Sequence, residues 1–390
     1  MNILYIAGET VPGNDGGAVH VREVATNLAK LGCQVTVLCN LGPGQARDEM
    51  LDGVRVLRAR MSLGGKTFPL LGLWRALGLI TQPFDVVMER YVTFGGAGMV
   101  FSALNDVPLA LEVNSPHVEE LIWRLRIGSR AARAFLRGWV WLMFQRARLV
   151  LSPLESIVPA SGASKVRLVS WGADVEKFRP DLRDAERCRQ LGSRYGLEGK
   201  IVVLFTGTFR AWHGVLRLPS IIERVAAQQP DVMFLLVGKG ECLDEVKRTV
   251  AERGLEDRVV FTGEQAHDEI PFFVAASDIG IAPYDLDAYW PLKEFGFFWS
   301  PLKIFEFMAG GLPVVTVDVP PLNQVVADGL RGRVAPPGND QAMAEAIVGL
   351  VRDGSRRTDM GAQARAHVAS HYSWAGHASV LMGYLADVVA

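Results

Sequence analysis

The chain lacks the features that mark several classes of protein. Its net charge is only −1 over 390 residues, which argues against a general nucleic-acid binder. No basic segment precedes the short apolar run at the N-terminus, so no signal peptide is expected. The uncharged stretch 91–105 is rich in glycine and too short to span a bilayer. The cysteines have no metal-ligand spacing and are expected to be reduced, packing cysteines of a cytosolic protein: Cys33, Cys39, Cys188 and Cys242.

What the chain has is a repeated α/β pattern. A hydrophobic content of 49% over 390 residues predicts two well-packed domains. Each half opens with an apolar strand, at 2–7 and at 201–206, followed by a glycine loop and an amphipathic helix. This pattern predicts two facing Rossmann-like domains, 1–172 and 173–373. A C-terminal helix, 374–390, is expected to cross back to the first domain.

Two loops of the first half lie where open α/β sheets bind ligands. Gly16 and Gly17 precede the first helix, where backbone N–H groups can approach a diphosphate. The loop lacks the G-x-G-x-x-G pattern, so a tight turn without a ligand fits equally well. Asn114 and His117 follow the strand predicted over 108–113, and His117 could contact a sugar or phosphate, although a lone histidine is more often structural.

The stretch SPLKIFEFMAGGLPVV, residues 300–315, combines a loop, a short helix and a buried strand. Lys303 lies near the start of the helix and could neutralise a phosphate. Glu306, three residues later, could accept hydrogen bonds from sugar hydroxyls. Taken alone, the two residues favour a different interpretation, a surface Lys–Glu contact of little energetic value.

Residues 121–148 contain no acidic residue. Four of the arginines, Arg126, Arg130, Arg133 and Arg137, have the spacing of one helical stripe, and Phe135, Trp139 and Leu142 form an apolar stripe beside it. Such a helix either meets anionic lipid headgroups or an anionic acceptor, or covers an ordinary core with a solvated face. All seven arginines of the segment are Arg124, Arg126, Arg130, Arg133, Arg137, Arg146 and Arg148.

The motifs together resemble those of retaining GT-B glycosyltransferases of the family 4 type, and the resemblance covers nearly the whole chain. GGAVHV at 16–21 is similar to that family's first glycine loop, and SWGADVEKFRP at 170–180 to its interdomain segment. LLVGKGE, VVFTGE and IAPYD, at 235–241, 259–264 and 281–285, resemble three further landmarks. The stretch at 300–315 carries the most specific match, to a subset with the motif S-P-x-K-x-x-E.

Some positions depart from the family pattern. Most members carry two glutamates in this motif; Glu306 matches the second, whereas the first would fall at Phe298. The family's phosphate-binding arginine and lysine are replaced by Thr208 and His213, and Arg210 between them is expected to supply charge.

The resemblance implies transfer of a sugar from a UDP- or GDP-sugar to an acceptor hydroxyl, with retention of configuration and without a metal or other cofactor. It assigns His117, Asn114, Lys303 and Glu306 to the reacting groups. Among these, Glu306 would bind the ribose, and His117, with Asn114 as the alternative, the donor sugar. The donor site implied by the resemblance comprises Gly16, Gly17, Thr208, Arg210, His213, Gly238, Glu264, Gln265, Ser300, Pro301, Leu302, Lys303, Ile304 and Glu306.

Two alternatives remain open from the sequence. One is a nucleotide-sugar epimerase of GT-B shape, which would need an acid and a base in the cleft. The other is a non-catalytic nucleotide-sugar binder, suggested by the altered phosphate-binding residues. The expected location is cytoplasmic, with peripheral contact between segment 121–148 and the inner face of an anionic membrane as one interpretation.

Overall fold

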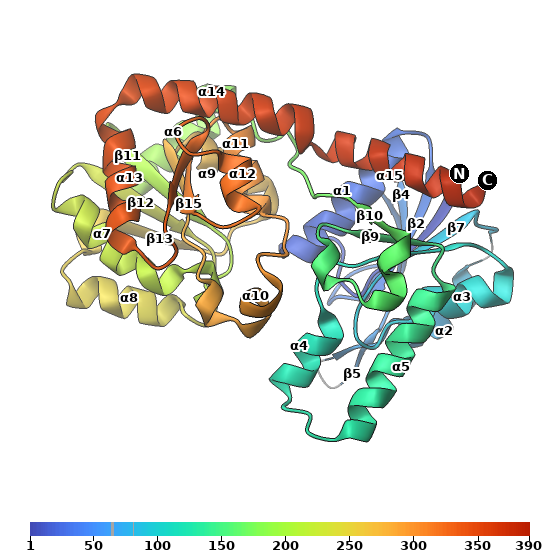
Figure 1. The fold of residues 1–390 in the computed structure, drawn as a ribbon. Helices are drawn as coiled ribbons and strands as arrows, with labels where there is room; N and C mark the ends of the chain where they lie inside the picture. Colours follow the sequence, from blue (N-terminus) through green and yellow to red (C-terminus); the bar gives the residue numbers. More distant parts are fainter. Residues whose placement is uncertain (64–65, 81) are drawn as a thin grey trace. The chain divides into compact units, whose positions relative to one another are not determined.

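The computed structural model describes residues 1–63, 66–80 and 82–390 (Figure 1). The chain forms two compact units: unit 1 comprises Met1–Trp171, Phe298–Ser300 and Trp374–Ala390, and unit 2 comprises Gly172–Phe297 and Pro301–Ser373. The sequence placed the boundary at Gly172 and assigned 374–390 to the first domain. It assigned 298–300 to the second domain, whereas the contacts of these three residues group them with unit 1.

Unit 1 is built on an eight-stranded sheet in the order β10-β9-β8-β7-β1-β2-β4-β3. All neighbouring strands pair in parallel except β3, which runs antiparallel to β4 at one edge. The central strands are buried apolar runs, as parallel strands covered on both faces must be. The strands are β1 (Asn2–Ile6), β2 (Gln34–Asn40), β3 (Asp48–Leu51), β4 (Val54–Ala59), β7 (Val86–Arg90), β8 (Leu109–Glu112), β9 (Leu149–Ser152) and β10 (Val166–Leu168); β5 (Ser62–Leu63) and β6 (Lys66–Thr67) form a separate antiparallel pair.

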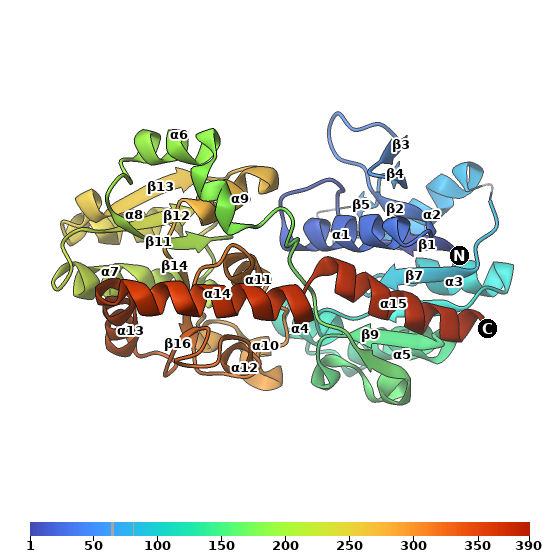
Figure 2. The ribbon, with the colours of Figure 1, turned by 90° about the horizontal axis from the view of Figure 1, so that it is seen from above.

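Helices cover this sheet, and the C-terminal helix α15 packs against α1 (Figure 2). Helix α3 starts on a buried acid, because the carboxylate of Glu89 accepts hydrogen bonds from the amides of Gly96, Ala97 and Gly98 at 2.7–3.0 Å. The helices of unit 1 are α1 (Gly16–Lys30), α2 (Pro69–Ala76), α3 (Ala97–Asn105), α4 (His117–Arg124), α5 (Arg130–Arg146) and α15 (Trp374–Val389).

Unit 2 contains a six-stranded, fully parallel sheet in the order β13-β12-β11-β14-β15-β16. Its strands are β11 (Ile201–Thr206), β12 (Val232–Val237), β13 (Val259–Gly263), β14 (Ile279–Ala282), β15 (Val314–Val317) and β16 (Gly332–Ala335). Its helices are α6 (Glu186–Tyr195), α7 (Leu218–Ala226), α8 (Leu243–Glu252), α9 (Ile270–Ala275), α10 (Trp290–Phe295), α11 (Leu302–Ala309), α12 (Leu322–Val326), α13 (Asp340–Arg352) and α14 (Gly354–His371).

Both sheets are doubly wound, so the predicted fold class is confirmed. In unit 1 the strand order reverses between β1 and β7, and in unit 2 it reverses between β11 and β14. At such a switch point the loops after two adjacent strands turn to opposite faces and leave a crevice at the carboxyl ends of the strands. Each unit therefore has one position where its topology favours a ligand site.

Candidate functional site

The switch point of unit 2 holds the side chain of Lys303. This residue lies in the first turn of α11 and is only 8% exposed. Its Nζ lies 4.2 Å from the ring centroid of Phe205, on β11, and 5.3 Å from that of Tyr284, just after β14. The loops after β11 and β14 thus converge on one cationic group.

Close packing of the loops requires glycine at two positions here. Gly207 follows β11 with φ +128°, and a Cβ there would lie 3.1 Å from Lys303 Nζ. Gly238 follows β12 with φ +140°, and a Cβ there would lie 1.9 Å from the carbonyl oxygen of Gly207. A side chain at Gly238 would collide with backbone. The predicted donor residue Gly238 therefore has a structural role in holding the loop over Lys303.

The ammonium group of Lys303 has no hydrogen-bond partner within the part of the chain that the structure describes. Burial lowers the pKa of Lys303 to about 7, against the raising effect of Glu306. A buried cation without a partner is costly, because neither water nor an anion compensates for its desolvation. The aromatic faces of Phe205 and Tyr284 offset only part of this cost. Lys303 is therefore a candidate for binding an anion.

Helix α11 adds backbone donors at the same place. The amides of Ile304 and Phe305 bond to the carbonyl of Pro301, at 2.9 and 3.2 Å. Helix geometry leaves the amides of Leu302 and Lys303 without an intrahelical acceptor. The predicted donor residues 301–304 therefore combine a helix N-terminus with a cationic side chain, an arrangement that favours an anion.

The residues that replace the family's usual phosphate ligands lie on the loop after β11. Thr208 and Arg210 are exposed, and the guanidinium of Arg210 pairs with no described residue. His213 Nδ1 lies 2.5 Å from the carbonyl oxygen of Thr208. Burial, with Lys303 nearby, holds the pKa of His213 well below its usual value, so the ring is neutral at pH 7. Arg210 can supply the missing charge on this loop, and His213 cannot.

Glu306 lies on α11, three residues after Lys303, and is 5% exposed. One carboxylate oxygen, Oε1, lies 3.0 Å from His267 Nε2. His267 follows β13, and its ring contacts Phe178 edge-on at 6.0 Å between centroids. Sequence reasoning did not identify His267, because 39 positions separate it from Glu306 and no motif includes it.

The structure shows other contacts for the remaining predicted donor residues, Glu264, Gln265 and Ser300. Glu264, at the end of β13, pairs with Lys239 at 2.5 Å and is exposed. The side-chain amide of Gln265 donates to the carbonyl of Thr262 at 3.0 Å. Ser300 groups with unit 1, where its Oγ accepts a hydrogen bond from the amide of Trp171 at 3.1 Å. The structure therefore gives Ser300 a hydrogen bond within unit 1.

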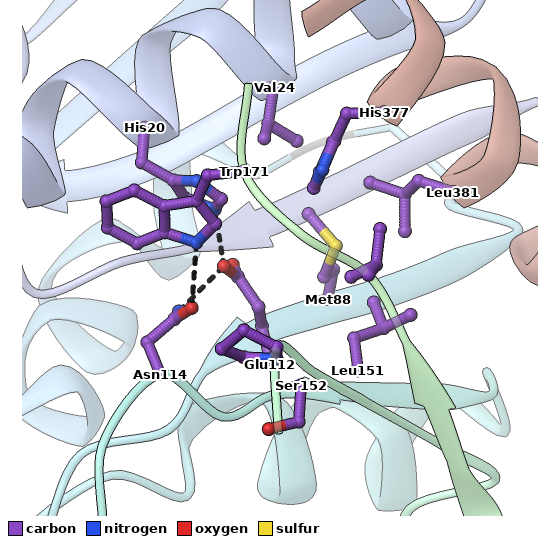
Figure 3. A pocket seen from close by; sticks show the side chains of 12 residues that line it. His20, Val24, Met88, Glu112, Asn114, Leu151, Ser152, Trp171, His377 and Leu381 are labelled. Atoms are coloured by element: carbon purple, nitrogen blue, oxygen red, sulfur yellow. Dashed lines mark hydrogen bonds and ion pairs between the residues drawn. The ribbon is translucent and has the colours of Figure 1, made fainter. Parts of the chain in front are cut away.

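The switch point of unit 1 is filled by an internal polar network around Glu112 (Figure 3). Tyr5 Oη donates to Glu112 Oε2 at 2.5 Å, and Asn114 Nδ2 donates to Oε1 at 2.7 Å. Arg90 Nη1 lies 3.4 Å from Oε1, and His20 Nε2 is in direct contact with the same oxygen. These four donors come from β1, α1, the end of β7 and the segment after β8. We call Tyr5, His20, Arg90, Glu112 and Asn114 the Glu112 network.

Electrostatics in this network favour one charge state. Burial raises the pKa of Glu112, but His20 and Arg90 outweigh it and hold the pKa below its usual range. Burial lowers the pKa of His20 to about 4, so His20 is a neutral donor at pH 7. Arg90 also pairs with Glu9 at 2.9 Å. The carboxylate of Glu112 is therefore ionised and enclosed by donors of its own unit.

Trp171 covers the Glu112 network. Its indole N–H donates to Asn114 Oδ1 at 3.0 Å, and its ring stacks on His20 at 4.3 Å between centroids (Figure 3). A cavity of about 10 Å³ beside them, lined also by His377, has room for about one water molecule. The amide of Asn114 is thus bonded on both sides, which argues against its predicted contact with a substrate.

His117 is the more accessible of the two predicted sugar contacts. It starts α4, its side chain is 32% exposed, and Nδ1 lies 3.6 Å from Glu120 Oε2. Its ring contacts Tyr91 edge-on at 5.6 Å between centroids. Burial of part of the ring lowers the pKa of His117, with Glu120 opposing. The imidazole is therefore available as a neutral hydrogen-bonding group.

At the predicted phosphate contact, Gly16 and Gly17, the structure provides an acceptor from the protein itself. Asp15 caps α1, and its Oδ1 accepts hydrogen bonds from the amides of Gly17 and Ala18, both at 3.0 Å. A Cβ on Gly17 would lie 3.0 Å from the carboxylate of Glu9. The amides of Gly17 and Ala18 already have an acceptor, and the carboxylates of Asp15 and Glu9 would repel a phosphate. The sequence pattern showed the glycines but not that Asp15 would be the cap.

No group of three or more His, Cys, Asp or Glu side chains in the described ranges is arranged to hold a metal ion. No helix in the same ranges is long and apolar enough to cross a membrane.

Comparison with known proteins places the chain among glycosyltransferases. Residues 15–167 match the model of the glycosyl transferase 4-like domain, and residues 200–353 match that of glycosyl transferases group 1. The chain is 26% identical over 428 residues to a D-inositol 3-phosphate glycosyltransferase of Corynebacterium aurimucosum, covering 100% of this chain and 97% of the relative. It is 28% identical over 216 residues to an α-D-kanosaminyltransferase of Streptomyces kanamyceticus, a match that spans 55% of this chain and about half, 51%, of that relative.

The fold agrees with these matches. The structure of Anabaena HepE in complex with UDP and glucose superposes with a TM-score of 0.74 at 20% identity, covering 99% of this chain and 100% of HepE. The chain therefore has the two-domain GT-B fold and combines a glycosyl transferase 4-like domain with a glycosyl transferases group 1 domain.

Proposed function

We propose that the protein transfers a sugar from a nucleotide-diphosphate sugar to an acceptor hydroxyl, with retention of the anomeric configuration. The observation that carries this proposal is the buried, unpartnered ammonium group of Lys303 at the switch point of unit 2. A donor diphosphate would supply the missing anion. HepE was solved with UDP and glucose, which supports a UDP-sugar, with a GDP-sugar as the other candidate donor.

Each group in unit 2 then has a distinct task. Lys303 and the amides of Leu302 and Lys303 bind the diphosphate, and Arg210 supplies a second charge from the exposed side. Glu306 accepts hydrogen bonds from the ribose hydroxyls through Oε2, because His267 contacts the other carboxylate oxygen, Oε1. His267 orients the carboxylate through its 3.0 Å contact with Oε1.

The chemistry assigned to the protein is charge stabilisation and positioning. As the sugar–phosphate bond breaks, negative charge grows on the diphosphate, and a preorganised cation and helix N-terminus stabilise it. In a front-face mechanism the leaving phosphate oxygen accepts the acceptor's proton, so no protein carboxylate has to act as base. Retention follows because the acceptor approaches from the face that the diphosphate leaves. We include metal independence in the proposal, since Lys303 and the amides perform the task that a divalent ion performs elsewhere.

We also propose an acceptor class, a residue that contacts the donor sugar, and a cellular location. The name of one relative contains D-inositol 3-phosphate, and we propose a small polyol, or a glycan or glycolipid precursor, as the acceptor class. His117, at the carboxyl end of β8, is proposed to contact the donor sugar. Cytoplasmic location follows from the expected intracellular supply of nucleotide sugars.

The decisive experiment begins with thermal unfolding in the presence of UDP-, GDP- and dTDP-sugars, because a ligand that binds the folded state raises the midpoint. The best donor is then incubated with a panel of polyols and glycan acceptors, and the product is analysed by NMR. We expect one nucleotide class to raise the midpoint and an axial or equatorial product linkage that matches the donor. Inverted linkage would refute retention. Isomerised donor without any transfer would identify an epimerase, and binding without turnover a non-catalytic binder.

A further inference from the structure

Helices α4 and α5 of unit 1 form a pair joined by a short turn (Figure 1). The structure corrects the predicted arginine stripe, because the basic segment is two helices and not one. Arg126 lies in the turn, with φ +48°, and α5 begins only at Arg130. Arg133 bonds to the carbonyl of Ile127 at 2.6 Å, and Arg137 pairs with Glu119 on α4 at 3.0 Å. Two of the four predicted stripe arginines therefore tie the helix pair together.

The exposed face of α5 is apolar. Its exposed positions recur every three or four residues, so they lie on one side of the helix. Phe135 is 73% exposed, Trp141 52% and Leu142 47%. Trp139, which the sequence placed in the apolar stripe, instead points back to the unit and donates to the carbonyl of Gly95 at 3.1 Å. The exposed residues of α5 are Arg130, Ala131, Ala134, Phe135, Arg137, Gly138, Trp141, Leu142 and Gln145. Helical spacing places Arg130 and Arg137 at one edge of this face and the apolar residues across the rest of it.

Charged groups border this face on one side. Arg124, at the end of α4, Arg126 in the turn, Arg130 at the start of α5 and Arg148 just beyond its end are exposed and form no ion pair with any described residue. The acids of the pair are Glu119, which is bonded to Arg137, and Glu120, which lies 3.6 Å from His117. Both acids of the helix pair thus contact a basic side chain of the pair, and the four arginines remain without an acid partner among the described residues.

We propose that the outer face of α4 and α5 docks onto an anionic membrane surface. An apolar stripe with aromatic residues, bordered by arginines, is the pattern of a helix that lies in the lipid–water interface. The aromatic and leucine side chains would enter the headgroup boundary, while the arginines contact anionic headgroups. Charge complementarity favours this occupant over a second copy of the chain, which would bring the same arginines face to face. The proposal does not depend on the transfer reaction.

The test is co-sedimentation of the full chain with vesicles of equal parts phosphatidylglycerol and phosphatidylcholine, with pure phosphatidylcholine vesicles as reference. We expect binding to the anionic vesicles at low salt, weakening as salt rises. Replacing Arg124, Arg126 and Arg130 with Gln is expected to lower the partition coefficient about five-fold per arginine. A variant with Phe135, Trp141 and Leu142 all changed to Ser is expected to lower it by more than about ten-fold, because apolar burial is lost.

Matched controls come from unit 2: Leu330→Ser removes an apolar side chain that is 44% exposed, and Arg352→Gln removes an exposed arginine. Neither is expected to change vesicle binding, and circular dichroism checks that every variant is folded. Absence of binding to anionic vesicles at low salt would refute the proposal. Binding that ignores the apolar triple variant would also refute it, since that is plain electrostatic adhesion. A dimer in sedimentation velocity that the triple variant abolishes, without vesicle binding, would assign the face to a second copy.

Discussion

The switch point of each unit contains a buried charged side chain, but the two side chains differ in their hydrogen-bond partners. In unit 1 the carboxylate of Glu112 is buried and enclosed by Tyr5, His20, Arg90 and Asn114. In unit 2 the ammonium group of Lys303 is buried and has no hydrogen-bond partner among the described residues. Topology favours a ligand at both positions. The charged group itself has hydrogen-bond partners in unit 1, and it has none among the described residues in unit 2. A compensated charge is explained by the fold itself, whereas an uncompensated one indicates a ligand.

The same difference distinguishes a structural from a functional role for the two glycine loops of the chain. The loop containing Gly16 and Gly17 has the form of a phosphate site, yet Asp15 bonds its amides. The loop containing Gly207 carries Thr208 and His213 where the family pattern has arginine and lysine. It nevertheless packs against the ammonium group of Lys303, which has no hydrogen-bond partner among the described residues. The distribution of unsatisfied charge is therefore a better guide to the donor site than the glycines.

Removing Glu112 should produce the largest loss of stability. Glu112→Ala leaves Arg90 with Glu9 as its remaining acid and removes the acceptor of Tyr5 and Asn114. Breaking a buried ionic network by removing one partner costs about 3–5 kcal/mol of unfolding free energy. Urea denaturation followed by circular dichroism measures this loss. Glu119→Ala, which breaks the exposed pair with Arg137, is the control and should cost under about 1 kcal/mol. Equal losses for the two variants would show that the Glu112 network is not a stability element.

Replacing Lys303 should lower the donor affinity without lowering the stability of the fold. Lys303→Met removes an uncompensated buried cation, so the unfolding free energy should stay equal or rise. Donor affinity should fall about 10- to 150-fold, because a charge-assisted hydrogen bond to the diphosphate is lost. Isothermal calorimetry with UDP or GDP measures the affinity. Lys239→Met, at an exposed lysine paired with Glu264, is the control and should change little. A destabilised Lys303→Met protein with unchanged affinity would reverse the comparison between the two units.

The sequence predicted more of the fold than of the sites. Buried β-branched runs such as 201–206 and 232–237 predicted the strands, because parallel strands need apolar side chains on both faces. Lys303 and Glu306 were predicted because their motif is local. Helix α14 was missed, since its buried residues Met360, Ala364 and Val368 are scattered among polar ones.

Contacts between distant segments could not be predicted. The Glu112 network combines residues from strand ends more than 100 positions apart, and no pattern in one segment specifies it. The contact of His267 with Glu306 depends on how the loop after β13 meets α11. The exposure of Phe135 and Trp141 could not be predicted either. Helical spacing separates an arginine stripe from an apolar stripe, but it does not show which of the two faces solvent.

Donor binding should depend on pH through Lys303. The pKa of Lys303 is about 7 in the free protein, and a bound diphosphate should raise it. The complex then binds more protons than its components above pH 7, so affinity should be constant below pH 7 and fall by up to ten-fold per unit above it. His213, also facing Lys303, has a pKa well below 6.5 and stays neutral over this range. Calorimetry between pH 6 and 9 in buffers of different ionisation enthalpy measures affinity and proton uptake. Lys303→Met should abolish the uptake; uptake that persists would assign it to another group.

The smallest effect is expected at His267. Its substitution tests whether the carboxylate of Glu306 in unit 2 depends on an internal hydrogen-bond partner, as the carboxylate of Glu112 does in unit 1. His267 holds one oxygen of Glu306 at 3.0 Å and is proposed to position the carboxylate for the ribose. His267→Ala should raise the donor KM about ten-fold with little change in kcat, since the contact acts on binding and not on the reacting bond. His267→Gln can still donate a hydrogen bond from Nε2 and should recover most of the affinity. His371→Ala, at an exposed histidine on α14, is the control. If His267→Gln behaves like His267→Ala, the imidazole acts through packing on Phe178, and Glu306 is then held by α11 alone.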